Sequence, residues 1–123
     1  MISRFNATIL IPTGATTVTA YVGPRTLRGR IHAIKYTPGT LATGAHLTIT
    51  GETSAVPILI KANAGTSVVW FYPRAFPNQN TDGAAEADAR EDIHVAEERI
   101  KVAVKDAVAA QTGTIEIWVD SPQ

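Results

Sequence analysis

The sequence predicts an all-β fold, either an antiparallel β-sandwich of jelly-roll-like form or a small barrel, with about seven or eight strands. Apolar and polar residues alternate along most of the chain, which is the period of a strand with one buried face. Gly, Pro and Asn gather between the alternating segments, where turns require them. The segments mostly follow one another at intervals of about 8–14 residues, a spacing typical of short antiparallel strands.

Five predicted strands lie in the first half of the chain. Residues 4–12 alternate between apolar and polar side chains, and residues 16–22 are β-branched and followed by Gly-Pro. Residues 30–36 end at a Thr-Pro-Gly turn. Residues 46–52 alternate Leu and Ile with Thr, and residues 56–62 lead into an Asn-Ala-Gly turn. Each segment therefore combines a strand-like interior with a turn that ends it.

Three further strands are predicted in the second half. Residues 67–73 are apolar on both sides, and residues 113–120 alternate Ile and Val with Glu, Trp and Asp. Residues 98–107 alternate Ile and Val with Arg and Lys, so their basic side should face solvent or a partner. Their apolar side should lie in the core, and it consists of Ile100, Val102 and Val104.

The segment 78–97 interrupts this pattern. It is acidic and rich in Ala, and it lacks the wide apolar stripe of a packed helix, so we expect a long inserted loop or a short helix. Loops of this length are usually functional or disordered. We expect it to leave the sandwich and contact a neighbouring subunit. It contains one base, Arg90, and six acids: Asp82, Glu86, Asp88, Glu91, Asp92 and Glu97.

Length and composition indicate one domain, residues 1–123. The chain has no cysteine, which excludes disulfides, thiolate zinc sites and cysteine nucleophiles. No stretch reaches the roughly 18 apolar residues of a membrane helix, and the N-terminus lacks the apolar core of a signal peptide. A cytoplasmic origin without a membrane partner is the default expectation.

Charge is unevenly divided along the chain. Residues 1–75 hold seven bases and one acid, whereas residues 76–123 hold four bases and ten acids, giving net charges of +6 and −6. Because the whole chain has 11 bases and 11 acids, nucleic-acid binding is not expected. Docking of one end of the protein on the oppositely charged end of a neighbouring copy is preferred over nucleic-acid binding as the interpretation of this asymmetry.

A search for catalytic chemistry gives no constellation. Gly83 directly follows Asp82, which breaks the ligand spacing of a calcium-binding loop, although a divalent ion between subunits remains an alternative. His94 and Glu97 have the spacing of half a helical metal pair, without a second half. Nucleophile elbows, phosphate-binding loops and dinucleotide fingerprints are also missing. We therefore predict no enzyme, cofactor, metal site or small-molecule substrate.

Aromatic and basic residues supply the candidate interface. Trp70 and Tyr72 share one side of a predicted strand: either both sides of that strand are core, or these rings form a subunit interface, where aromatics are enriched. A basic turn around residues 25–30 is either a solvated connection or an arm that pairs with carboxylates of a partner. The candidate subunit or capsid interface comprises Arg25, Arg28, Arg30, Trp70, Tyr72, Arg74, Asp82, Glu86, Asp88, Glu91, Asp92 and Trp118.

Two stretches carry a family resemblance. GRIHAIKYTPGTLATGAHLTITGETSAVPILIKANAGTSVVWFYPRA (29–75) and ERIKVAVKDAVAAQTGTIEIWVD (98–120) resemble a group of small virion proteins of tailed bacteriophages. The resemblance implies a capsid decoration, or cement, protein: a β-sandwich, commonly a homotrimer, that binds the major capsid protein on the outside of the shell. It also implies assembly in the host cytoplasm and location on the virion surface. The segment 78–97 has no counterpart in it.

Two alternatives remain open at this stage. The first is a head–tail joining or tail ring component, which copy number per particle would distinguish from a shell protein. The second is a glycan-binding sandwich that uses Trp70, Tyr72 or Trp118 as stacking platforms. Sugar binding that is lost on Trp→Ala substitution, while assembly survives, would favour the second alternative.

Overall fold

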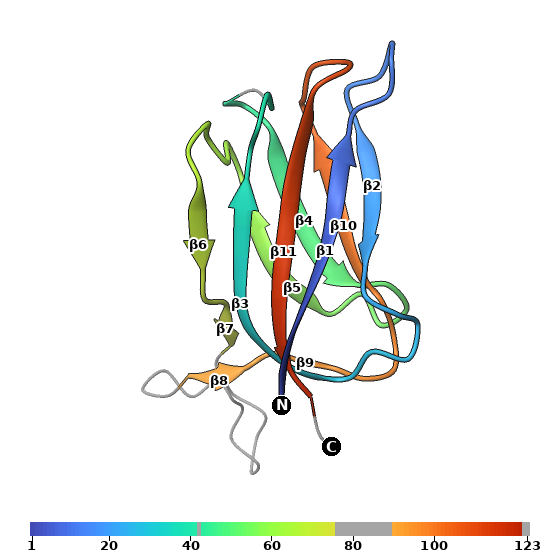
Figure 1. Cartoon of the computed structure of the whole chain (residues 1–123), viewed down its shortest axis with the longest axis vertical. Helices are drawn as coiled ribbons and strands as arrows, with labels where there is room; N and C mark the ends of the chain where they lie inside the picture. Colours follow the sequence, from blue (N-terminus) through green and yellow to red (C-terminus); the bar gives the residue numbers. More distant parts are fainter. Residues whose placement is uncertain (42, 76–89, 122–123) are drawn as a thin grey trace, which may run out of the picture.

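The computed structural model describes residues 1–41, 43–75 and 90–121 (Figure 1). Within these ranges the regular elements are eleven β-strands and no helix, which confirms the predicted all-β fold. The strands are β1 (Ile2–Leu10), β2 (Val18–Val22), β3 (Gly29–Thr37), β4 (His46–Gly51), β5 (Pro57–Lys61), β6 (Val69–Phe71), β7 (Arg74–Ala75), β8 (Glu91–Asp92), β9 (His94–Val95), β10 (Ile100–Lys105) and β11 (Thr112–Asp120).

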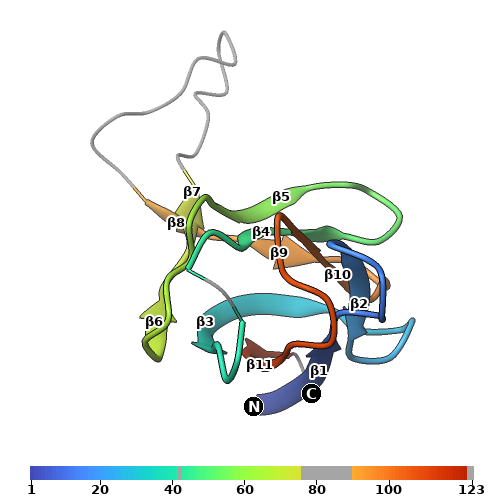
Figure 2. The ribbon, with the colours of Figure 1, turned by 90° about the horizontal axis from the view of Figure 1, so that it is seen from above.

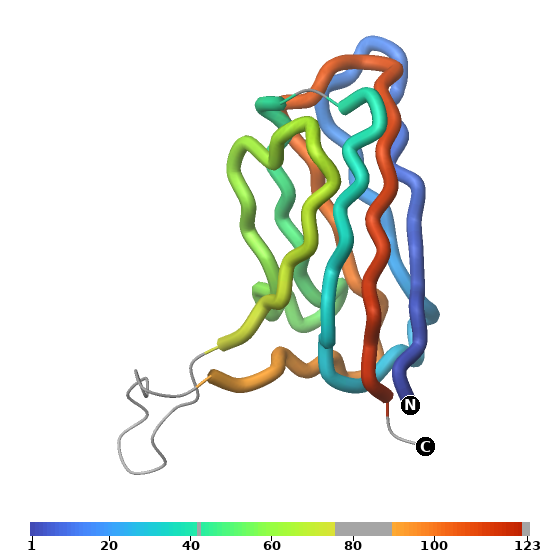
Figure 3. Tube along the Cα trace, turned by 60° about the vertical axis from the view of Figure 1, so that its left-hand side comes forward, coloured from blue at the N-terminus to red at the C-terminus, as the bar shows by residue number. Residues whose placement is uncertain are grey.

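Two antiparallel sheets face each other, as the sandwich prediction requires (Figures 1 and 2). The front sheet has the order β1-β11-β3-β6, and β9 also pairs with β3. The back sheet has the order β2-β10-β4-β5, and β7 and β8 form a separate small ribbon. Strand β1 lies against β2, so one side of the sandwich is closed. The first and last described residues lie at the same end (Figure 3), where the Ser121 N–H donates to the Met1 carbonyl at 2.9 Å.

The core lies between the sheets and follows directly from the alternation in the sequence. Ile100, Val102 and Val104 of β10 are at most 1% exposed, which confirms the predicted register of this strand. Each fully buried Val or Ile side chain stabilises the fold by about 1.5–3 kcal/mol. The facing residues of the front sheet are equally buried and include Ile9, Ile31, Ile34, Ile115, Ile117 and Val119.

The apolar segment predicted as one strand over residues 67–73 is divided. β6 covers Val69–Phe71 and pairs with β3, whereas Arg74–Ala75 form β7 and pair with β8. Pro73 lies between the two strands and has no N–H to donate to a sheet ladder. The chain therefore changes its pairing partner at this proline.

The prediction that residues 78–97 leave the sandwich is wrong for the last part of this segment. Glu91–Asp92 form β8, and His94–Val95 form β9, which pairs with the start of β3. The side chains of Ile93 and Val95 are only 8% and 3% exposed. Burial of these two alternating side chains, together with strand pairing, holds this segment against its own domain. Residues 78–89, with Asp82, Glu86 and Asp88, lie outside the described residues.

One carboxylate among the described residues is buried, that of Glu98. Its Oε1 accepts hydrogen bonds from the N–H groups of Thr53, at 2.7 Å, and Ser54, at 2.8 Å. Hydrogen bonds from Ser54, and then from Thr53, lower the pKa of this carboxyl although burial opposes the shift. A Cβ on Gly51 would lie 2.6 Å from Glu98 Oε1, so glycine leaves room for the carboxylate. Glu98 thereby fixes the turn between β4 and β5.

Candidate functional site

The three large aromatic residues singled out in the sequence meet on the outer side of the front sheet. We call Trp70, Tyr72 and Trp118 the aromatic face. The ring centroids of Trp70 and Trp118 lie 4.9 Å apart, and those of Trp70 and Tyr72 lie 6.5 Å apart with planes only 12° from parallel. Trp70 belongs to β6 and Trp118 to β11, so β3 lies between their strands. Strand pairing, and not proximity in the sequence, brings Trp70 and Trp118 together.

The interpretation that both sides of residues 67–73 are core is wrong. Trp70 is 44% exposed and Tyr72 is 60% exposed, whereas Phe71, which points to the other side, packs against the core. Side chains alternate along a strand, so the two exposed rings share one side. β6 is the last strand of its sheet, and its outer side is not covered by another layer among the described residues.

A groove runs beside these rings. It has a volume of about 290 Å³ and is lined by Ile2, His32, Ala33, Trp70, Tyr72 and Trp118. Ala33 is paired with Trp118 across β3 and β11, and its methyl group leaves space beside the larger rings. Next to this pair the register of the two strands shifts by a bulge, since Trp118 opposes Ala33 but Val119 opposes Ile31. The extra residue in the bulge is His32, and bulges commonly redirect a side chain.

A row of charged residues borders the aromatic face. Lys35 is paired with Trp70 across β3 and β6, and its Nζ lies 5.6 Å from the centroid of that ring. Glu116 is paired with Lys35 across β3 and β11, and Arg4 Nη1 lies 3.4 Å from Glu116 Oε2. A cation over a Trp ring contributes about 0.5–1 kcal/mol at an exposed site. The face therefore has an apolar centre and a charged margin.

Three of the four basic residues predicted to meet a partner, Arg28, Arg30 and Arg74, are paired within the chain. Arg28 Nη1 lies 3.9 Å from Glu97 Oε1, and Arg74 Nε lies 3.0 Å from Asp92 Oδ1. Each of these ion pairs joins a base of residues 1–75 to an acid of residues 76–123. The charge asymmetry of the sequence is thus partly neutralised inside one molecule, which the docking interpretation did not anticipate.

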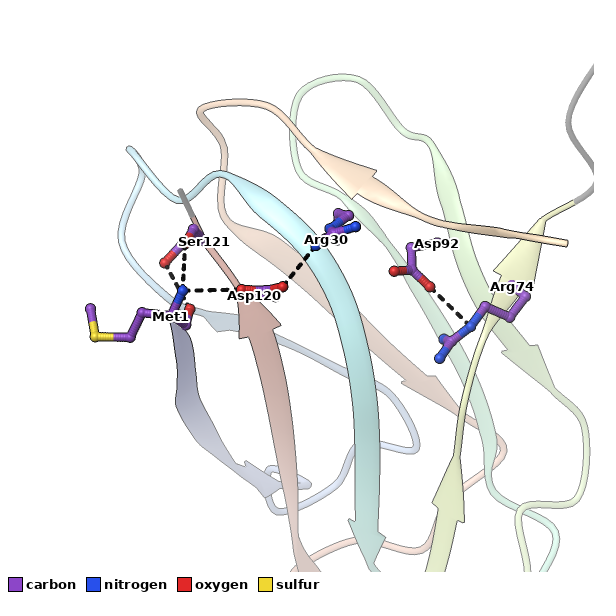
Figure 4. A network of polar contacts seen from close by, with 6 residues as sticks. All are labelled: Met1, Arg30, Arg74, Asp92, Asp120 and Ser121. Carbon is purple, nitrogen blue, oxygen red and sulfur yellow. Dashed lines mark hydrogen bonds and ion pairs between the residues drawn. The ribbon is translucent and has the colours of Figure 1, made fainter. Parts of the chain in front are cut away.

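Arg30 belongs to a similar network at the end of the sandwich (Figure 4). Its Nη2 lies 2.9 Å from Asp120 Oδ2, while the Met1 ammonium donates to Asp120 Oδ1 at 3.1 Å and to the Ser121 carbonyl at 3.0 Å. Hydrogen bonds from the N-terminal ammonium and then from Arg30 lower the pKa of Asp120. The carboxylate therefore ties β1, β11 and β3 together.

No protein-family model, curated protein or solved structure matches this chain. Among the described residues, no group of three or more His, Asp or Glu side chains could hold a metal ion. Within the same ranges, no helix is long and apolar enough to cross a membrane.

The remaining candidate residues do not join the aromatic face. Arg25 is exposed in the turn after Pro24, and Glu91 is exposed in β8. The pKa of Glu52 is lowered chiefly by a hydrogen bond from Arg99, and Arg25 adds a weaker effect of its charge.

Sequence reasoning missed the residues that complete the groove and its margin, because only strand pairing places them there: Ile2, His32, Ala33 and Lys35.

Proposed function

We propose that this protein is a structural virion protein of a tailed bacteriophage, which decorates the capsid by binding the major capsid protein on the outside of the shell. The exposed aromatic face on the front sheet is the observation that carries this proposal. Trp and Tyr are enriched at protein–protein interfaces and dominate their hot spots. The stretches that resemble phage virion proteins, 29–75 and 98–120, contain all three of these aromatic residues.

The size of the aromatic face fits the centre of such an interface. One large aromatic side chain buries about 150–250 Å² when it is fully covered. A standard interface buries about 800 Å² on each partner, so the three rings would form its core and not its whole area. The groove could accept an apolar side chain of the capsid protein, with Lys35 and Arg4 at the polar margin.

Particle occupancy tests this function. Phage particles that lack the protein are incubated with wild type or with the double variant Trp70→Ala/Tyr72→Ala, and bound protein is quantified on a stained gel. We expect the variant to bind about tenfold more weakly or worse. Ile60→Ala is the matched control, because Ile60 is 70% exposed on the back sheet. Equal occupancy by the double variant would refute docking through this face. Wild-type occupancy of only about six or twelve copies would favour a head–tail or tail ring component.

A second candidate function is glycan binding. It is favoured by the nearly parallel rings of Trp70 and Tyr72, 12° apart, beside the groove. Titration of the protein with a panel of oligosaccharides, followed by tryptophan fluorescence, tests it. Saturable binding that is lost in Trp70→Ala, with capsid occupancy unchanged, would support this function over decoration.

A further inference from the structure

Strand β6 has an open edge. It is the terminal strand of the front sheet and lies at the outside of the molecule (Figure 2). In an antiparallel pair, alternate residues of an edge strand direct their N–H and C=O groups away from the neighbouring strand. Among the described residues, these groups of Val69–Phe71 have no backbone partner on the side away from β3. Such an edge is a template for another extended chain.

The other sheet edges are protected in ways that β6 is not. β1 lies against β2 of the opposite sheet. β5 contains Pro57 and Lys61, and proline and lysine are the residues that commonly prevent an edge strand from pairing. Around β6, the stretch Thr-Ser-Val-Val-Trp-Phe-Tyr (66–72) contains no charge and no proline. Only the short length of β6, which has three residues, limits pairing at this edge.

The exposed apolar side chains of this stretch share one side. Val68 is 55% exposed, Trp70 is 44% exposed and Tyr72 is 60% exposed. They occupy alternate positions, so an added strand would meet all three on the same surface of the sheet. Main-chain groups at the edge select an extended polypeptide, and the neutral side chains offer no charge that would favour a charged partner.

We propose that β6 pairs with β6 of a second copy of this chain, antiparallel and around a two-fold axis, so that the two front sheets become continuous. Pairing centred on Trp70 places Trp70 against its counterpart and Val68 against Tyr72 of the second copy. Each of these three exposed apolar side chains then has an apolar neighbour, and no like charges oppose each other. Such a contact is isologous, because the same patch is used on both subunits.

The strand is too short for main-chain bonds alone to hold the pair. The aromatic and aliphatic contacts across the seam must therefore supply much of the affinity, and a charge placed among them should weaken it. A two-fold pair also differs from the three-fold assembly that the resemblance implies. Measured mass separates the two, because the chain has a mass of 13.1 kDa.

The test is sedimentation velocity of the full chain over a concentration series, with Val68→Lys and Ile60→Lys as matched variants. Both positions are exposed, so both variants should fold, and only Val68 lies at the proposed seam. We expect wild type and Ile60→Lys to form a species of twice the chain mass, and Val68→Lys to dissociate about tenfold more readily or worse. Hydrogen exchange of amides 68–72 should slow as concentration rises, while amides 57–61 should not change.

A monomer at all concentrations, a three-chain species, or a Val68→Lys pair as tight as wild type would each overturn the pairing. The experiments distinguish failure of the β6 pairing from failure of the proposed function. A monomer that still loses particle occupancy on Trp70→Ala/Tyr72→Ala refutes only the pairing. A two-chain species with the expected β6 protection that never occupies particles refutes only the decoration role.

Discussion

The guanidinium of Arg74 and the carboxylate of Asp92 meet across the β7–β8 pair, with Nε 3.0 Å from Oδ1 (Figure 4). Arg74 Nη1 also donates to the Pro73 carbonyl at 2.7 Å and reaches the His32 carbonyl at 3.5 Å. These contacts lie between β6 and β9, the two short strands that pair with successive parts of β3. Arg74 thus braces its own domain, where the sequence suggested a residue for a partner.

The first prediction concerns this brace. Arg74→Ala should lower the free energy of unfolding by about 1 kcal/mol, because an ion pair whose side chains are 30% and 33% exposed contributes little and the carbonyl contacts add to it. Arg74→Lys is the matched control, since it keeps the charge but loses the forked donor geometry. Urea denaturation gives the stability, and hydrogen exchange of amides 91–95 should accelerate in Arg74→Ala. Unchanged exchange there would show that β8 and β9 are held without Arg74.

The second prediction tests the register of β10. Val102 is fully buried, so Val102→Asp should lower the free energy of unfolding by about 3–5 kcal/mol or prevent folding, since it buries an unpaired charge. Ala103→Asp is the control, because Ala103 points to the outer side of the back sheet, opposite Thr48 and Thr19. Ala103→Asp should lower the free energy of unfolding by less than about 1 kcal/mol. Equal melting temperatures for the two variants would contradict the register.

The strands could be predicted because their alternation is strong and local. β10 and β11 show a strict period of two, and each turn contains residues that only turns favour. β8 and β9 escaped prediction because each has only two residues, and their pairing depends on distant partners in β7 and β3. Propensity carries almost no information over so short a length, whereas burial of Ile93 and Val95 decides the outcome.

The candidate site was predicted only in part. Alternation identified Trp70, Tyr72 and Trp118 as residues of nominally outer faces, and the structure brings them together. The groove depends on β3 lying between β6 and β11 and on the bulge beside Ala33, which a single sequence does not encode in any local pattern. The ion pairs of Arg28, Arg30 and Arg74 likewise follow from topology, and the sequence pattern did not predict them.

The third prediction concerns pH. The pKa of Glu98 is lowered in the folded state, by hydrogen bonds from Ser54 and Thr53, from an ordinary value of 4.5. A lowered pKa means that the unfolded chain binds the proton more tightly. The stabilisation from ionised Glu98 is therefore fully present above pH 4.5 and is lost as the pH falls through the lower folded-state value.

Glu98→Gln isolates this contribution, because Gln keeps an acceptor oxygen but cannot ionise. A hydrogen bond from Arg99 lowers the pKa of Glu52, and one from the N-terminal ammonium lowers the pKa of Asp120. Both acids are present in wild type and in the variant, so their contributions to the loss of stability in acid are the same in the two proteins. Melting temperatures between pH 3 and pH 7 should show a lower value for the variant near neutrality and converging curves in acid, as linkage requires. Parallel curves would mean that Glu98 does not titrate differently in the folded state.

The last prediction separates binding by the aromatic face from its role in stability. Trp70 and Tyr72 are 44% and 60% exposed, so Trp70→Ala/Tyr72→Ala should remove mainly the ring contact with Trp118. Such an aromatic pair contributes about 0.5–1.5 kcal/mol, and the domain should remain folded. Ile117→Ala, at a fully buried position of β11, is the reference and should cost about 2–5 kcal/mol. Urea denaturation of the three proteins compares these losses. If the double variant lost as much stability as Ile117→Ala, the two rings would serve the core, and a defect of that variant in particle binding could not be assigned to a lost interface.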